Sequence, residues 1–196
     1  MRPQMWIVAG PNGSGKTTLT RRYFVGRIPV VNPDEIARGL ALSYAFDARQ
    51  SLAAGREAIT QREAHIAAKR SFAIETTLTG KGELQLIDRA REAGFKVNLV
   101  YTGLNGAYLS MLRVTQRVTA GEHAIPLADI VRRYPRSIEN LTLAAKRVDR
   151  LLVLDNSSDR RRLILSRDQD RERYLASEIP AWAERALGLC ARSKLM

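Results

Sequence analysis

The sequence is poor in the residues that build disulfides and many metal centres. Cys190 is the only cysteine among 196 residues, and His65 and His123 are the only histidines. A single cysteine forms no internal disulfide and suits a reducing compartment, so we expect a cytoplasmic protein. With so few Cys and His residues, a zinc-type centre built on these ligands is also excluded.

Long apolar runs are missing as well. No stretch approaches the roughly 18 apolar residues that a membrane-spanning helix needs. The first strand-like segment starts within a few residues of Met1, so we expect no signal peptide. The length and the ordinary hydrophobic fraction of 45% predict one globular domain over residues 1–196.

Acidic residues are too few to balance the basic ones. Asp and Glu total 20 against 32 Lys and Arg, which gives a net charge of +12. This excess favours anionic ligands such as nucleotides, phosphorylated sugars, nucleic acid or an acidic protein. Aromatic residues make up only 6% of the chain and are not interleaved with basic ones, as they are in single-strand nucleic-acid binders. Nucleic acid is therefore the weaker candidate.

The sequence does contain a complete phosphate-binding loop. Residues 10–18 read GPNGSGKTT, after an apolar strand-like run over 5–9 and before a helix-like segment over 17–24. Glycines let successive backbone amides turn toward phosphate oxygens. Lys16 is expected to reach the β- and γ-phosphates, and the Thr17 hydroxyl to ligate Mg²⁺. The residues predicted to bind ATP are Gly10, Pro11, Asn12, Gly13, Ser14, Gly15, Lys16, Thr17 and Thr18.

Two further strand ends carry polar side chains. An apolar run over 28–31 leads into Asn32 and Asp34, followed by a helix over 35–42; a third strand over 72–74 leads into Glu75, Thr76 and Thr77. In open α/β sheets, ligands bind at the carboxyl ends of the strands. Asp34 is therefore either a catalytic base or, like Asn32, a helix cap, and the residues after the third strand are expected to contact a ligand.

The second half combines helices with a dense set of arginines. Arg113 and Arg117 are spaced to share one face of a helix over 107–119. After a break over 121–126, helices are expected over 127–134 and from Pro135 to 148, with further arginines at the junction. This region, about 105–149, is predicted to be a mobile helical lid; the alternative is a helical hairpin with solvated arginines.

The last part of the chain is expected to complete the sheet and add an extension. A strand over 151–154 ends at Asp155 and Asn156, near the expected place of a base or ribose. The charged extension over 159–196 is expected to hold two edge strands, 162–166 and 173–176, and a helix over 179–189. Strands alternating with helices predict an α/β fold: a parallel P-loop kinase-like sheet of about five strands with helices on both faces.

Taken in order, these motifs resemble the zeta toxin family of P-loop kinases, especially its compact chromosomal members, over roughly residues 4–158. The motifs that carry the resemblance are the phosphate loop, Asn32-Pro-Asp34-Glu, Phe72-Ala-Ile-Glu75-Thr-Thr, the Arg113/Arg117 helix, Gly121-Glu-His123-Ala-Ile-Pro126, Arg132-Arg-Tyr-Pro-Arg136-Ser and Asp155-Asn156-Ser157.

The resemblance implies ATP- and Mg²⁺-dependent phosphoryl transfer to a sugar hydroxyl, that of UDP-N-acetylglucosamine in the best-known toxins. It implies Asp34 as catalytic base and Arg113 or Arg117 as a phosphate-gripping residue beside Lys16. The residues expected to contact the acceptor are Asn32, Glu75, Thr76, Thr77, His123, Arg133 and Arg136.

The sequence departs from the family at one lid position. His123 aligns where the plasmid toxins carry a second lid arginine, and Arg132, Arg133 or Arg136 could supply that charge instead. Other interpretations stay open: a kinase for another metabolite or an antibiotic, or a nucleic-acid-associated P-loop ATPase. No antitoxin segment is recognisable, so any antitoxin would be a separate protein.

Overall fold

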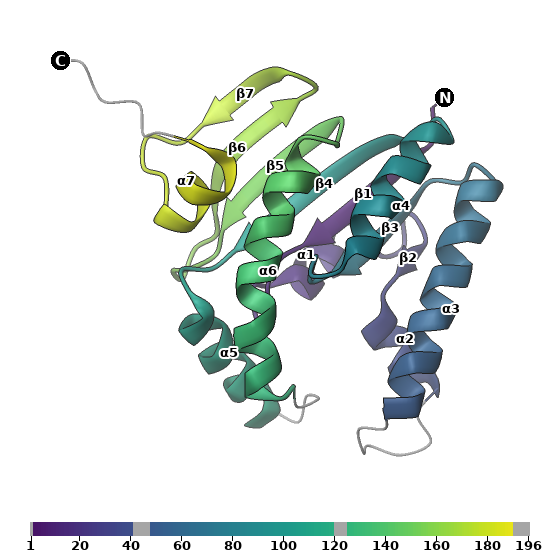
Figure 1. Cartoon of the computed structure of the whole chain (residues 1–196), viewed down its shortest axis with the longest axis horizontal. Helices are drawn as coiled ribbons and strands as arrows, with labels where there is room; N and C mark the ends of the chain where they lie inside the picture. Colours follow the sequence, from purple (N-terminus) through teal and green to yellow (C-terminus); the bar gives the residue numbers. More distant parts are fainter. Residues whose placement is uncertain (1, 41–47, 120–124, 190–196) are drawn as a thin grey trace.

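The computed structural model describes residues 2–40, 48–119 and 125–189. The chain forms a seven-stranded sheet in the order β2-β3-β1-β4-β5-β6-β7 (Figure 1). The strands are β1 (Gln4–Ala9), β2 (Val30–Val31), β3 (Phe72–Thr76), β4 (Lys96–Gly103), β5 (Arg150–Asp155), β6 (Arg162–Asp168) and β7 (Arg171–Leu175). The helices are α1 (Lys16–Tyr23), α2 (Pro33–Leu40), α3 (Ala48–Ala67), α4 (Lys81–Glu92), α5 (Ala107–Thr119), α6 (Leu127–Ala145) and α7 (Ala181–Leu187).

The sheet has a parallel part and an antiparallel addition. Strands β1 to β5 pair only in parallel with one another. β6 then runs antiparallel to β5, and β7 antiparallel to β6. The prediction of an α/β fold with a parallel sheet of about five strands is confirmed, and the hairpin over 162–175 adds the two further strands expected in the extension. The edge strands of this sheet are β2 and β7, whereas β6 lies between β5 and β7, so the expectation of an edge strand is wrong for β6.

Helices cover both faces of the sheet, as predicted. Met5 and Ile7 of β1 belong to a large core with residues of α3, α4, α6 and α7. Val8 points the other way and packs with Leu19 and Phe24, from α1 and its end. This alternation is the period of two expected of a strand buried on both sides. Among the described helices, none is long and apolar enough to cross a membrane.

The lid region differs from the sequence-based expectation at Pro135. Residues 127–145 form the single helix α6, with Pro135 in its interior rather than at the start of a new helix. An interior proline removes a backbone hydrogen bond and costs about 3 kcal/mol. Ile130 and Leu141, on either side of Pro135 in the sequence, are fully buried, and their packing keeps the helix continuous.

The C-terminal helix docks on the end of a central strand. The Trp182 side chain is only 1% exposed. A β-carbon at Gly103 would lie 2.3 Å from the Trp182 ring, so the end of β4 has room for this ring only because residue 103 is glycine. The indole Nε1 donates a hydrogen bond to Asp155 Oδ1 at 3.2 Å. The extension is thereby fixed to the edge of the sheet where the parallel strands end.

Candidate functional site

The phosphate loop lies at the carboxyl edge of the parallel strands. It leaves β1 after Ala9, which is in register with Thr76 of β3 and Tyr101 of β4. The backbone φ angles of Gly10, Gly13 and Gly15 are 144°, 72° and 85°, a region that strongly favours glycine. A β-carbon on Gly10 would also lie 2.1 Å from the Thr102 carbonyl oxygen. The glycines of the motif are therefore required by backbone conformation and by close approach.

Lys16 is held inside this loop. Its Nζ donates a hydrogen bond to the Pro11 carbonyl oxygen at 2.9 Å, and the residue is only 9% exposed. Burial lowers the pKa of Lys16 to about 8, against the opposing influence of the Glu75 and Asp34 carboxylates, while the Arg117 charge lowers the pKa further. The structure thus brings together four residues that the sequence proposed for the chemistry.

Glu75 and Thr17 face each other between β3 and α1. The Thr17 hydroxyl donates to Glu75 Oε1 at 2.7 Å, and the Glu75 residue is 6% exposed. The second carboxylate oxygen, Oε2, is buried and has no hydrogen-bond partner. A carboxylate and a hydroxyl are the hard oxygen ligands that Mg²⁺ takes, usually one or two from the protein with the rest from phosphates and water. These two residues fit a magnesium ion.

In the described part of the chain, no group of three or more His, Cys, Asp or Glu side chains could hold a metal ion. At Thr17 and Glu75, an ion would need nucleotide phosphates and water to complete its coordination.

Asn32, rather than Asp34, caps helix α2. The Asn32 Oδ1 accepts the Asp34 backbone N–H at 2.9 Å, the hydrogen bond expected of an N-cap residue. Asn32 is 3% exposed, whereas Asp34 is exposed and its charge acts on Lys16. Asp34 is therefore not the N-cap of α2, and its carboxylate is not occupied in capping this helix.

The two threonines after Glu75 have different surroundings. The Thr76 hydroxyl donates to Glu83 at 2.9 Å and accepts the Leu78 N–H at 3.0 Å, so it stabilises the turn into α4. Thr77 lies on the same side of the chain as Glu75 by strand alternation, and its hydroxyl pairs with that of Thr79 at 3.1 Å. Of the two, Thr77 is the better placed to meet a ligand.

Helix α5 packs directly on the phosphate loop. A β-carbon on Gly13 would lie 3.1 Å from both the Arg113 Cβ and the Ser110 carbonyl oxygen. The Ser110 hydroxyl donates to the Asn12 carbonyl oxygen. Helix α5, the amino-terminal half of the predicted lid, therefore contacts the phosphate loop. The Arg113 side chain begins at the edge of this loop.

The remaining lid arginines are partly paired. Arg132 and Arg133 form ion pairs with Asp129 at 2.7 and 3.3 Å. The hydrogen bond from Arg132 is the main cause that lowers the pKa of Asp129. Arg136 is exposed. His123 lies outside the described residues.

Several residues that contact the site gave no signal in the sequence. Thr102, Ser110 and Arg161 each reach a carbonyl oxygen of the phosphate loop, as does Asn156, which the sequence suggested only as a neighbour of the base. They come from β4, α5 and the segment after β5. No local pattern marks them, because each is defined only by a contact with a distant part of the chain.

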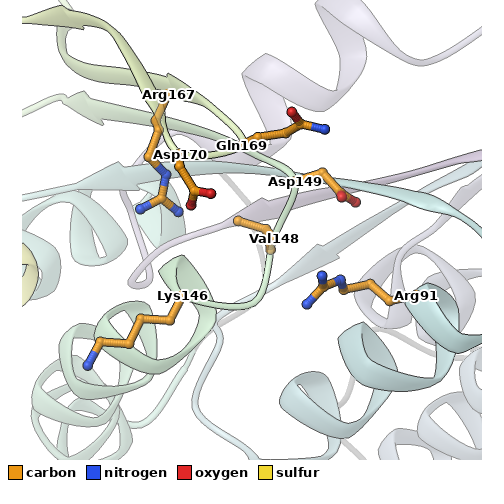
Figure 2. Close-up of a pocket in the computed structure, with 7 residues that line it drawn as sticks. All are labelled: Arg91, Lys146, Val148, Asp149, Arg167, Gln169 and Asp170. Carbon is orange, nitrogen blue, oxygen red and sulfur yellow. The ribbon is translucent and has the colours of Figure 1, made fainter.

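A cavity of about 470 Å³ lies away from this site, beside the amino end of β5 (Figure 2). It is lined by side chains of both signs, and those of Arg167 and Asp170 come from the β6–β7 hairpin. The lining residues are Arg91, Lys146, Val148, Asp149, Arg167, Gln169 and Asp170. The cavity shares no residue with the phosphate loop or with the strand ends that carry Asp34 and Glu75.

Comparisons with known proteins agree with the geometry. A family model described as an AAA domain matches residues 5–134. A protein of Haemophilus influenzae described as uncharacterized is 32% identical over 140 residues, which are 67% of this chain and 97% of that protein.

Two solved structures show the same fold. A chain of the AvrRxo1-ORF1:AvrRxo1-ORF2 complex with ATP has a TM-score of 0.71 and 18% identity, over 87% of this chain and 60% of that one. The PezAT chromosomal toxin–antitoxin system of Streptococcus pneumoniae has a TM-score of 0.57 and 20% identity, over 79% of this chain and 68% of that one. This chain thus spans about 60% of the first of these neighbours.

Proposed function

Since this chain belongs to the AAA domain family of P-loop proteins, we propose that it is an ATP-dependent kinase that transfers the γ-phosphate to a hydroxyl group. One observation carries the proposal: the carboxylates of Asp34 and Glu75 both lie close enough to Lys16 to influence its pKa. Carboxylates at this edge of the sheet lie where ligands bind in open α/β folds, and Asp34 has the exposure that a base for an acceptor hydroxyl needs.

In this proposal each side chain has one task. Asp34 orients the acceptor hydroxyl and takes its proton as the hydroxyl attacks the γ-phosphate. Lys16 leaves the Pro11 carbonyl oxygen and neutralises charge on the β- and γ-phosphates. Arg113 and Arg117, on the helix beside the loop, add positive charge around the transferring group.

Thr17 and Glu75 would hold the magnesium ion. Bound there, the ion would neutralise phosphate charge and help orient the β- and γ-phosphates. Catalysis of this kind depends on positioning and charge, so no cysteine or histidine nucleophile is needed.

For the acceptor we propose a sugar hydroxyl, with UDP-N-acetylglucosamine as the first compound to test. The support is the order of motifs described above together with the fold shared with the PezAT system. Among the candidates in the described part of the chain, Thr77 and Arg136 are the side chains that we propose to contact such an acceptor. A separate antitoxin protein is proposed on the same grounds.

The test is transfer of label from γ-labelled ATP with Mg²⁺ to a panel of UDP-sugars and other small alcohols. Asp34→Asn is expected to bind ATP normally and to lose transfer by at least ~10²-fold, the lower range for loss of a general base. Glu35→Gln, the adjacent acid in the same helix turn, is the matched control and is expected to keep activity. Near-normal transfer by Asp34→Asn would remove Asp34 from this role.

The acceptor panel decides the substrate separately. Labelled UDP-N-acetylglucosamine would support the sugar-nucleotide proposal, and label on another alcohol would identify a different kinase. Label released only as free phosphate, at a rate that nucleic acid raises, would favour a nucleic-acid-associated ATPase over the kinase.

A further inference from the structure

The carbonyl oxygens of the phosphate loop are held by side chains from outside it. The Ser14 oxygen accepts hydrogen bonds from Thr102 Oγ1 and Asn156 Nδ2, each at 3.0 Å. The Gly15 oxygen accepts one from Arg161 Nη2 at 3.4 Å. Both lone pairs of the Ser14 oxygen are therefore occupied, which fixes the direction of this carbonyl group.

Holding a carbonyl fixes the following amide. A trans peptide unit is planar, so its C=O and the next N–H point in opposite directions. The bonds to the Ser14 oxygen thus set the direction of the Gly15 N–H. The Gly15 oxygen also accepts the Leu19 N–H at 3.2 Å, so Arg161 reinforces a direction of the Lys16 N–H that helix α1 already favours. These amides belong to the loop that would bind phosphates. Because Gly15 is glycine, its backbone could otherwise turn with little steric resistance.

We propose that Asn156 and Arg161, in the segment 156–161 between β5 and β6, are positioning residues that keep the phosphate loop in its binding conformation. The proposal rests on the proposed binding of ATP. It assigns a task to a segment that lies beyond residues 5–134, the part matched by the family model. Both side chains act through the loop backbone rather than through the nucleotide base.

Close contact and anchoring support this task. A β-carbon on Gly15 would lie 2.9 Å from Asn156 Nδ2 and 3.0 Å from Arg161 Nη2, so both groups lie directly against the loop. Asn156 is itself fixed, because its backbone N–H donates to the Gly103 carbonyl oxygen at 3.0 Å. The preceding Asp155 is 5% exposed and accepts hydrogen bonds from Ser157 and Trp182.

The test measures binding rather than activity, with ATP and inorganic triphosphate as the two ligands in calorimetry. Asn156→Ala is expected to raise the Kd of both ligands by the same factor, about fivefold for one neutral hydrogen bond. Arg161→Gln is expected to weaken both ligands as well. Arg160→Gln is the control: it removes the same charge one residue away, from an exposed side chain that contributes no bond to the loop.

A double variant tests the shared oxygen. Because Thr102 and Asn156 hold the same carbonyl, Asn156→Ala combined with Thr102→Val is expected to weaken triphosphate binding by more than the product of the single effects. Unchanged Kd values in Asn156→Ala and the double variant would overturn the proposal.

A second result would also overturn it: Asn156→Ala weakening ATP while leaving inorganic triphosphate unchanged would make this residue a base contact. Failure of the kinase proposal looks different, because a wild-type protein that binds both ligands and phosphorylates no acceptor still gives the Kd values that decide the role of Asn156 and Arg161.

Discussion

The two halves of the candidate site are built in different ways. The nucleotide half is a backbone loop whose carbonyl oxygens at Asn12, Ser14 and Gly15 are each held by a side chain from elsewhere in the fold. The proposed acceptor half consists of side chains, chiefly Asp34 and Thr77, that follow the ends of two strands. Asp34 has an exposed side chain, whereas the loop around Lys16 is buried.

We infer from this difference that the loop provides affinity for the nucleotide and the strand-end side chains provide specificity for the acceptor. A buried loop with fixed peptide units has its donors oriented before a ligand arrives, which lowers the entropic cost of binding. Exposed side chains at strand ends can change from one protein to another without disturbing the core. We therefore expect variants of the first half to change nucleotide and metal affinity, and variants of the second to change transfer.

The strongest test of this separation within the nucleotide half is Glu75→Gln. Loss of the carboxylate beside Thr17 should raise the Mg²⁺ concentration needed for half-maximal transfer by about 10- to 100-fold, the range typical of groups that support a metal site. A magnesium titration of the transfer rate measures this. A variant with an unchanged magnesium requirement and a lower transfer rate would place Glu75 in the acceptor half instead.

A smaller effect is expected from pH, through Lys16. In the protein without nucleotide, burial lowers the pKa of Lys16 to about 8. Bound phosphates would favour the charged form of Lys16 and raise this pKa again. Above pH 8, binding must therefore take up a proton, and ATP affinity should fall by up to about tenfold per pH unit. Below pH 8 the ATP affinity should no longer change with pH. Calorimetry between pH 6.5 and 9.5 measures this; the same affinity at pH 7 and pH 9 would contradict it.

The smallest effect is expected at Trp182, outside both halves. Trp182→Phe keeps an aromatic ring over Gly103 and removes the hydrogen bond to Asp155. We expect a loss of about 1.5 kcal/mol in the free energy of unfolding, the lower end of the range for a hydrogen bond to a carboxylate. Denaturant unfolding measures it, with Trp6→Phe as the control for ring size. A Trp182→Phe variant as stable as wild type would show that this bond adds nothing.

The parts of this molecule that could be predicted from the sequence are those that depend on residues contiguous in the chain. The phosphate loop was one, and so was α5, whose observed bounds of 107 and 119 are those expected from the helical pattern. The prediction that a new helix begins at Pro135 was wrong, because the burial of residues on either side outweighs the cost of a proline inside a helix. Asn32 and Asp34 could not be told apart as caps, because both residue types favour that position.

Contacts between residues far apart in the chain could not be predicted from the sequence. Ser110 is one serine in the middle of a helix, and only the fold shows that its hydroxyl meets the Asn12 carbonyl oxygen. Nothing in the sequence around Gly103 indicates that a tryptophan from α7 packs against this glycine. The inner place of β6 in the sheet was missed for the same reason, because its pairing with β5 is not specified by its own sequence.

The position of Trp182 also bears on how the protein is made. During synthesis, the phosphate loop leaves the ribosome first, and Thr102, Asn156 and Trp182 follow in that order. A nascent chain that stops before Asn156 contains the complete nucleotide-binding motif but lacks a side chain that holds the Ser14 carbonyl. Until Asn156 has been added, the Ser14 carbonyl lacks one of its two side-chain donors, so we expect the nascent loop to bind nucleotide more weakly than the finished protein.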